Sequence, residues 1–294
     1  MRVGIVDVGA NTVRLLVATR DGERLTAVRE ERVQLGLGEE IERTGAISGD
    51  KLEETAAVAA TRVRRARKLQ CAAVEVLVTS PGRQALNGLE LVRRLAHETG
   101  APTRVLSAQE EGELAWRGAV AAAREVPATV AVCDVGGGSA QIAVGSPESG
   151  PAWVRSVDIG SLRLTRRAFR CDPPTPADLR RANRAIAEAF ADLAPPLPRA
   201  ALAVGGTARA LRRVAGDTLD ADELERALDA LRQLSSRQLA KTYRLDRNRA
   251  RTITAGALIL AEIQRRLTVP LDVARGGVRE GAALALLDAT AAAA

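Results

Sequence analysis

The sequence has few of the residues on which several enzyme classes depend. Its 294 residues include one histidine, His97, and three cysteines, Cys71, Cys133 and Cys171. Because the cysteines are far apart and the histidine has no second one to pair with, zinc hydrolysis and nucleophilic triads are excluded. We interpret His97 as a surface residue at the polar end of a helix. An odd number of widely spaced cysteines indicates a reducing compartment, so we expect a cytoplasmic protein.

Aromatic residues and lysines are also scarce. Two Phe, two Trp and one Tyr leave little for base stacking, and the net charge of +7 rests on arginine, with only three lysines. There is no long basic tail, so we predict no nucleic-acid partner. A soluble polyanionic substrate fits the positive charge equally well. No apolar run is long enough to span a bilayer and no leader precedes the first strand, so we expect no membrane partner.

Glycine is concentrated in a loop between two apolar runs. Residues 133–145 read CDVGGGSAQIAVG. Glycines allow the backbone to approach a ligand closely, so that successive N–H groups converge on phosphate oxygens. The candidate phosphate-binding residues here are Gly136, Gly137, Gly138 and Ser139. Asp134, at the end of the first run, suits a metal, because magnesium commonly binds one or two carboxylates together with waters and substrate phosphates. A flexible turn is the alternative explanation of this loop taken alone.

The same pattern occurs near the start of the chain, where residues 4–18 read GIVDVGANTVRLLVA. Alignment of Asp7 with Asp134 pairs Gly9 with Gly136, Asn11 with Gly138, Thr12 with Ser139, and Arg14 with Gln141. Two similar loops predict a duplicated domain, with a cleft in which each half offers one loop to a shared polyanion. Chance similarity of two hairpins is a weaker explanation.

Two further features suit phosphate. The strand at 200–204 is followed by Gly205, Gly206 and Thr207 at the start of a helix, whose first amides form an anion site. A plain strand-to-helix turn explains this loop equally well. Arg83 follows the strand at 74–79, at the edge where α/β sheets bind ligands, and a guanidinium there can grip phosphate through two hydrogen bonds. An ordinary arginine in the first turn of a helix is the equal alternative.

A helix from 108 to about 124, capped by Ser107, has acids in its first turn. Glu110 and Glu111 suit the helix dipole, which is reason enough for acids at that place. Because the helix joins the first half to the second loop, its first turn also suits a general base.

The order of elements predicts an α/β protein. Strands at 2–8, 13–19 and 25–33 form a meander with a turn at Asp21-Gly22, followed by a loop at 35–47 and helices at 49–69 and 82–98. A second meander at 129–135, 140–144 and 153–157 precedes helices at 177–192, 221–233, 236–243 and 247–267. We place an N-terminal domain at 1–123, joined by a returning helix at about 280–294, and a second domain at 124–279.

The ordered motifs resemble the exopolyphosphatase and guanosine pentaphosphate phosphohydrolase family, in the actin-like ATPase superfamily. They are VDVGANTVRLL, TSPGRQALN, SAQEEGELAW, DVGGGS, DIGSLRLT, the Gly-Gly-Thr loop and VREG. The match covers nearly the full length and favours the short, two-domain form. The resemblance implies two ribonuclease-H-like domains, each with a five-stranded type of mixed sheet, an interdomain cleft, and hydrolysis of the terminal phosphoanhydride of polyphosphate or pppGpp. It also allows a homodimer.

The resemblance further assigns roles to residues. Glu111 is the expected base that activates water, with Glu110 as the less favoured neighbour. Magnesium, or manganese, is the expected cofactor, held at the positions Asp7, Asp134 and Gln141. Charge on the phosphates would be neutralised by the residues of the three loops and by two arginines, which are Asn11, Thr12, Arg14, Arg83, Gly136, Gly137, Gly138, Ser139, Gly205, Gly206 and Thr207.

Gln141 departs from the family pattern, which has Glu at this position. Glutamine ligates metal through its carbonyl oxygen but brings no charge, so we expect weaker metal affinity than is usual in the family. This departure motivates a second hypothesis, a polyphosphate or (p)ppGpp sensor that has lost catalysis. A third, an ATP-dependent small-molecule kinase of the same superfamily, is disfavoured because an acidic helix dedicated to a base indicates water as the acceptor.

Overall fold

The computed structural model describes residues 1–22 and 24–293 of the chain, and it divides into two compact units. Unit 1 comprises residues 1–122 and 276–294, and unit 2 comprises residues 123–275. The sequence-based division lies at 123/124 and 279/280. The predicted last residue of the returning helix, Ala294, lies outside the described residues.

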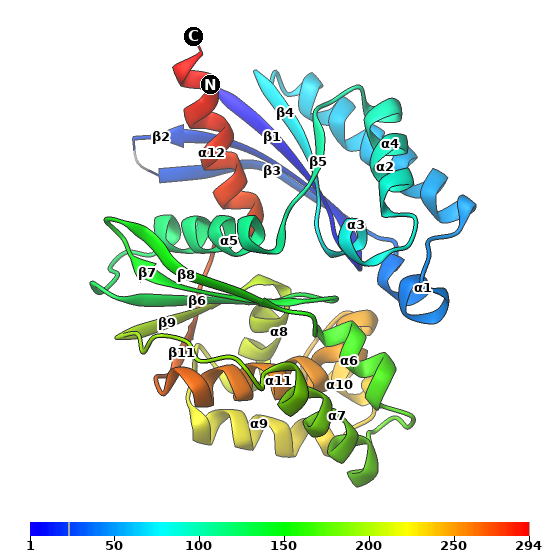
Figure 1. Cartoon of the computed structure of the whole chain (residues 1–294), viewed down its shortest axis with the longest axis vertical. Coiled ribbons are helices and arrows are strands. Elements are labelled where there is room, and N and C mark those ends of the chain that lie inside the picture. The colour runs from blue at the N-terminus through cyan, green and yellow to red at the C-terminus, as the bar shows by residue number, and fades with distance from the viewer. Residues whose placement is uncertain (23, 294) are drawn as a thin grey trace. The chain divides into compact units, whose positions relative to one another are not determined.

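Unit 1 is built on a five-stranded mixed sheet (Figure 1) of order β3-β2-β1-β4-β5. The strands are β1 (Arg2–Val8), β2 (Thr12–Asp21), β3 (Arg24–Gln34), β4 (Ala73–Val78) and β5 (Thr103–Val105). β1, β2 and β3 form an antiparallel meander, while β4 and β5 run parallel to β1. The opening meander is therefore confirmed. Asp7 lies near the end of β1, the central strand of the five-stranded sheet, opposite Arg14 on β2.

Helices cover both faces of this sheet. They are α1 (Leu37–Thr44), α2 (Gly49–Lys68), α3 (Ser80–Gln84), α4 (Gly88–Thr99), α5 (Ala108–Ala122) and α12 (Val278–Ala292). Side chains alternate along β1: Val6 and Val8 belong to the core shared with α2 and α4, whereas Val3 and Ile5 pack with α12. This alternation is the period of two that a strand imposes, so one strand serves two cores.

Unit 2 repeats the arrangement with a six-stranded sheet of order β10-β11-β9-β6-β7-β8. Its strands are β6 (Val130–Val135), β7 (Ala140–Ser146), β8 (Gly150–Val157), β9 (Ala200–Val204), β10 (Thr218–Leu219) and β11 (Leu271–Val273). The meander β6-β7-β8 is antiparallel, and β9 and β11 continue the sheet in parallel to β6. The predicted α/β class is confirmed. The sixth strand, β10, has only two residues, too few for a sequence pattern to show.

The helices of unit 2 are α6 (Ser161–Ala168), α7 (Pro176–Ala189), α8 (Gly205–Ala215), α9 (Ala221–Gln233), α10 (Ser236–Thr242) and α11 (Arg247–Leu267). Apolar residues from α7, α8, α9 and α11 share one core with the sheet, and α11 is buried along most of its length. The expectation of a buried helix at 247–267 is confirmed.

Two elements differ from the sequence-based expectation. The predicted loop at 35–47 contains the helix α1, whose Leu37 and Ile41 are buried. Gly36 and Gly45, at φ +71° and +78°, bound this helix on either side. The glycines in this segment cap the two ends of a short helix. Because glycine is also typical of loops, the sequence pattern indicated a loop.

The predicted helix at 82–98 is two helices, α3 and α4. Ala85 has extended dihedral angles (φ −79°, ψ 137°) and interrupts the helix. The break is fixed from outside, because the Asn87 side chain accepts from Ile47 N (3.0 Å) and donates to Ile47 O (2.8 Å). A contact over forty residues leaves no signal in the local sequence.

Candidate active site

Glu111 and Arg83 meet in unit 1. Glu111 lies in the first turn of α5, and its Oε2 accepts from Arg83 Nη2 at 2.7 Å. Arg83 Nη1 also donates to the carbonyl of Leu106 at 2.7 Å, so the guanidinium spans the end of the strand segment before α5 and the helix itself. The two side chains are largely buried, with exposed fractions of 21% for Arg83 and 11% for Glu111. The carboxylate is therefore held in one place by a charge-assisted hydrogen bond.

Glu110, the neighbouring acid, is used differently. Its Oε2 accepts from Ser107 N (2.8 Å), and its own N–H donates to Ser107 Oγ (3.1 Å), which forms a reciprocal helix cap. Arg104 Nη1 donates to Oε1 at 2.7 Å. The backbone hydrogen bond from Ser107 lowers the pKa of Glu110, with the Ser107 hydroxyl and Arg104 contributing in the same direction against the effect of burial. The predicted capping by Ser107 is confirmed, and Glu110 has a structural role.

The first loop joins β1 to β2 in a tight turn, in which Gly9 N donates to Thr12 O at 3.0 Å. The carbonyl of Asn11 accepts from two amides just before α1, and the carbonyl of Ala10 accepts from one within it. Arg14, on β2, donates from Nε to Thr12 Oγ1 at 3.1 Å. The loop thus directs carbonyl oxygens, which would repel phosphate, toward the start of a helix.

Asp7 lies close to three charged side chains of the same unit, those of Arg14, Arg279 and Glu280. Burial raises the pKa of Asp7 above its usual value, while the charges of Arg14 and Arg279 offset part of this rise and that of Glu280 adds to it. Arg279 is 8% exposed and comes from the first turn of α12, which sequence reasoning had noted only as part of the VREG motif. Unit 1 therefore brings together Asp7 and two arginines from three elements.

The glycine loop of unit 2 has the same turn. Gly136 N donates to Ser139 O at 2.9 Å, the bond that Gly9 and Thr12 make in unit 1. The carbonyls of Gly136 and Gly137 accept from the first amides of α6. Gly136 N–H is thus used inside the turn. Phosphate binding by the amides from Gly137 to Ser139 stays a prediction.

Gln141 occupies the place opposite Asp134, as Arg14 is opposite Asp7. Its side-chain amide nitrogen donates to Ser139 Oγ at 2.9 Å and to Ser156 Oγ at 3.1 Å. Only 1% of Gln141 is exposed. The expected metal ligand is therefore a buried amide whose nitrogen faces two serines, and Ser156 is a neighbour that the sequence did not identify.

The Gly-Gly-Thr loop begins α8 directly after β9. Gly205 has φ +83°, and a Cβ atom built there would lie 2.1 Å from Asp134 Oδ1, so only glycine leaves room for the carboxylate. Because a helix leaves its first amides without internal partners, those of Gly205, Gly206 and Thr207 are suited to an anion. Asp134 thus lies against the N-terminus of an 11-residue helix.

The Thr207 hydroxyl is fully engaged. It donates to Val135 O at 2.6 Å and accepts from Arg249 Nη1 at 3.1 Å. Arg249 is in the first turn of α11, and sequence reasoning missed it because nothing in the local pattern connects that helix with the loop at 205–207. Its position adds a guanidinium beside the N-terminus of α8.

Comparison with known proteins identifies the family of this chain. The model of the Ppx/GppA phosphatase family matches residues 16–290. The chain belongs to that family. Exopolyphosphatase 2 of Mycobacterium tuberculosis is 28% identical over 316 residues, which cover 97% of this chain and 98% of the relative. The resemblance drawn from the sequence is confirmed. Together with relatives named exopolyphosphatases, membership supports the predicted enzyme class, a phosphoanhydride hydrolase.

Solved structures of Ppx/GppA proteins share the fold. The crystal structure of the Aquifex aeolicus family member has a TM-score of 0.84 at 25% identity and covers 98% of both chains. An exopolyphosphatase from Cytophaga hutchinsonii has a TM-score of 0.87 at 21% identity, again over 98% of each chain. These similarities confirm the predicted actin-like fold of a Ppx/GppA phosphatase. In the part of the chain that is described, no helix is both long and apolar enough to cross a bilayer.

Each unit has one carboxylate near the end of an equivalent strand, Asp7 on β1 and Asp134 on β6. Within the described residues no group of three or more His, Cys, Asp or Glu is arranged to hold a metal. Asp134 nevertheless lies in a space that glycine at 205 keeps open, and Asp7 ends the equivalent strand of unit 1. Magnesium needs no more than one or two protein carboxylates when phosphates and waters supply the other ligands. Gln141 presents its nitrogen to the serines, so it adds no anionic ligand.

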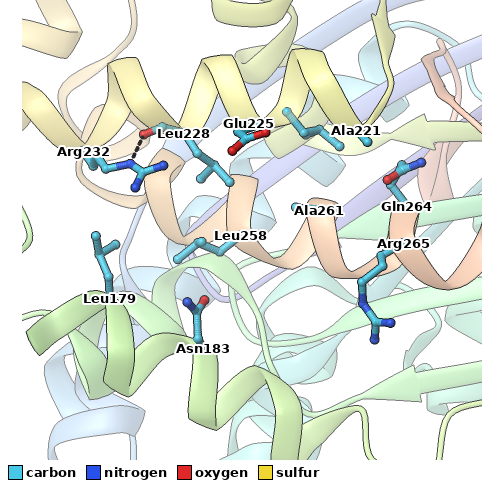
Figure 2. A pocket seen from close by; sticks show the side chains of 11 residues that line it. Leu179, Asn183, Ala221, Glu225, Leu228, Arg232, Leu258, Ala261, Gln264 and Arg265 are labelled. Carbon is cyan, nitrogen blue, oxygen red and sulfur yellow. Dashed lines mark hydrogen bonds between the residues drawn. The ribbon is translucent and has the colours of Figure 1, made fainter. Parts of the chain in front are cut away.

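A pocket of about 410 Å³ elsewhere in unit 2 has a different character (Figure 2). It lies among α7, α9 and α11, and it is lined by apolar residues such as Leu179, Leu228 and Leu258 with Arg232 and Arg265. None of the predicted site residues lines it. This pocket is therefore distinct from the predicted site residues of unit 2.

Proposed function

We propose that this Ppx/GppA phosphatase hydrolyses the terminal phosphoanhydride bond of inorganic polyphosphate, of pppGpp, or of both. The observation that carries the proposal is the buried pair of Glu111 and Arg83, with Glu110 engaged in a helix cap. A carboxylate fixed in place and not consumed by capping is suited to orient a water molecule. The names of the exopolyphosphatase relatives support polyphosphate as the substrate.

In the proposed reaction, Glu111 accepts a proton from water as the water oxygen attacks the terminal phosphorus. The bond from that phosphorus to the bridging oxygen breaks in line, and the shortened chain leaves. Arg14 and the loop amides of Gly137 to Ser139 and Gly205 to Thr207 stabilise the negative charge that develops on the phosphoryl oxygens. Arg83 positions Glu111, because its Nη2 donates to the Glu111 carboxylate while its Nη1 donates to the Leu106 carbonyl.

A divalent cation, magnesium or manganese, belongs to the same proposal. Asp7 in unit 1 and Asp134 in unit 2 are the carboxylates proposed to bind such a cation, which would neutralise phosphate charge. Burial opposes ionisation of Asp7, and a nearby cation would favour the ionised form. The protein residues supply the base, the amides and the arginines whichever metal is used.

The second candidate function is binding without turnover, as in a sensor of polyphosphate or (p)ppGpp. The observation that favours it is Gln141, whose amide is taken up by two serines and brings no charge to the site. Homodimer formation and a cytoplasmic location, expected from the sequence, belong to either candidate. Light scattering of the purified chain tests the first of these, and fractionation of cells tests the second.

The experiment that separates the two candidates measures phosphate release from long polyphosphate, tripolyphosphate and pppGpp with magnesium or manganese present. We expect release from at least one of the three, and the ratio of kcat/KM values identifies the preferred substrate. Tight binding of these anions with no release from any of them would overturn the hydrolase proposal in favour of the sensor.

A further inference from the structure

Four polar residues form a row on one face of the unit 2 sheet. Gln141 on β7 is directly opposite Asp134 on β6 and directly opposite Ser156 on β8. Directly opposite residues of antiparallel strands project to the same face, and so does Ser139, two residues before Gln141. The row therefore continues from the glycine loop, through Gln141, to a serine on the third strand.

The hydrogen bonds in this row have a definite direction. The amide of Gln141 has two N–H groups, and it donates to both Ser139 Oγ (2.9 Å) and Ser156 Oγ (3.1 Å). Each serine oxygen is thus an acceptor toward Gln141, and its own hydrogen points elsewhere. Among the bonds of residues 1–22 and 24–293, neither hydroxyl donates to a protein group. Both hydrogens remain for a ligand.

A glutamate at position 141 would reverse this arrangement. An ionised carboxylate only accepts hydrogen bonds, so each serine would turn its hydrogen toward position 141. The serine oxygens would then present lone pairs to the space that an anion would occupy. Compared with a glutamate at position 141, glutamine removes one negative charge and leaves the hydroxyl hydrogens of Ser139 and Ser156 available as donors.

We propose that Gln141 is a positioning residue that directs the hydroxyl hydrogens of Ser139 and Ser156 to a phosphate group, and that Ser156 is a further phosphate-binding residue. The inference rests on the proposed function only in taking a phosphate chain as the ligand. Two neutral donors attract phosphate oxygens without an intervening cation and offset the repulsion between a phosphate and Asp134 of the same row. The unit 2 subsite therefore binds a short phosphate chain even when no metal is present.

A double-mutant cycle tests this directly. The dissociation constant of tripolyphosphate is measured by calorimetry, with chelator present, for the full chain and for Ser156→Ala, Gln141→Glu and the double variant. We expect Ser156→Ala to weaken binding about tenfold, the usual effect of one hydrogen bond to a charged group. In the Gln141→Glu background the same substitution is expected to change binding by less than about twofold, because that hydroxyl already donates to the glutamate.

Ser146→Ala, at the far end of β7, is the matched control and is expected to leave the dissociation constant unchanged. An equal loss from Ser156→Ala in both backgrounds would show a structural role for Ser156 and overturn the inference, as would absence of tripolyphosphate binding to the unaltered chain. Phosphate release with magnesium is measured in parallel. A cycle that behaves as expected in a chain without turnover overturns only the hydrolase proposal, whereas turnover with a failed cycle overturns only this inference.

Discussion

Arg83 and Glu111 form a buried ion pair across 2.7 Å, although twenty-eight residues separate them in the chain. The adjacent acid, Glu110, pairs with Arg104 and with the backbone of Ser107 instead. Two neighbouring glutamates with the same local sequence environment therefore have different surroundings. One fixes the start of a helix, and the other is held by Arg83 of α3, the short helix that follows β4.

Substitution of Glu110 by alanine should affect stability more than activity. Loss of a helix cap lowers the free energy of unfolding by about 1 kcal/mol. Because the pKa of Glu110 is lowered in the folded chain, its stabilisation is present above the ordinary value of 4.5 and disappears as the pH falls through the folded pKa. Urea unfolding at neutral and acid pH measures the difference. An equal loss at both pH values would contradict the assignment.

Substitution of Gln141 by glutamate should strengthen metal binding. A carboxylate next to Asp134 adds an anionic oxygen ligand, which magnesium prefers to an amide. In an assay of phosphate release against magnesium concentration, the midpoint is expected to fall severalfold relative to the unaltered chain. Gln141→Asn is the control with no new charge. An unchanged midpoint in Gln141→Glu would refute the view that this position limits metal affinity.

Substitution of Gly205 by alanine should damage the proposed phosphate site. A Cβ atom there would lie 2.1 Å from Asp134 Oδ1, so the carboxylate would have to move. Gly150, with φ +81°, is the matched control, because a Cβ atom built there meets nothing within 4 Å. Both substitutions incur the left-handed backbone cost of about 1–2 kcal/mol. Only Gly205→Ala is expected also to reduce phosphate release, and equal activities in the two variants would exclude a role for this contact.

Asp178 gives a separate prediction for unit 2. Although burial opposes ionisation, hydrogen bonds from Thr175 and Arg170 and the charge of Arg181 lower the pKa of Asp178 to about 2. Its stabilisation is therefore full above the ordinary value of 3.8 and is lost as the pH falls toward 2. Asp178→Asn is expected to unfold at lower urea concentration at pH 7, with the difference shrinking in acid. If the difference in urea midpoint between Asp178→Asn and the unaltered chain stayed constant across this pH range, the lowered pKa of Asp178 would be contradicted.

The duplication of the two loops could be predicted because the similarity lies within two short segments, residues 4–18 and 133–145. Alignment of Asp7 with Asp134 placed Gly9 with Gly136 and Thr12 with Ser139, and these pairs make equivalent turn bonds at 3.0 and 2.9 Å. Strand order follows the same logic, since β3-β2-β1-β4-β5 corresponds to β8-β7-β6-β9-β11. Local geometry of this kind depends on glycine and on strand alternation, both of which the sequence displays.

Features that depend on distant contacts could not be predicted in this way. The helix α1 depends on carbonyls of the first loop, and the break between α3 and α4 depends on Ile47. Arg249 and Ser156 reach the site only through the packing of α11 and the pairing of β8. Each lies in a segment whose own pattern indicates only an ordinary helix or strand.

The most direct test of the account is phosphate release by Glu111→Gln compared with Glu110→Gln, in magnesium and with the preferred polyphosphate. Glutamine keeps the shape of glutamate but cannot accept the proton of water, so Glu111→Gln is expected to lower kcat at least about 100-fold. Glu110→Gln retains the helix cap and is expected to keep kcat within about twofold. Full activity in Glu111→Gln, or an equal loss in both variants, would contradict the assignment of Glu111 as the base.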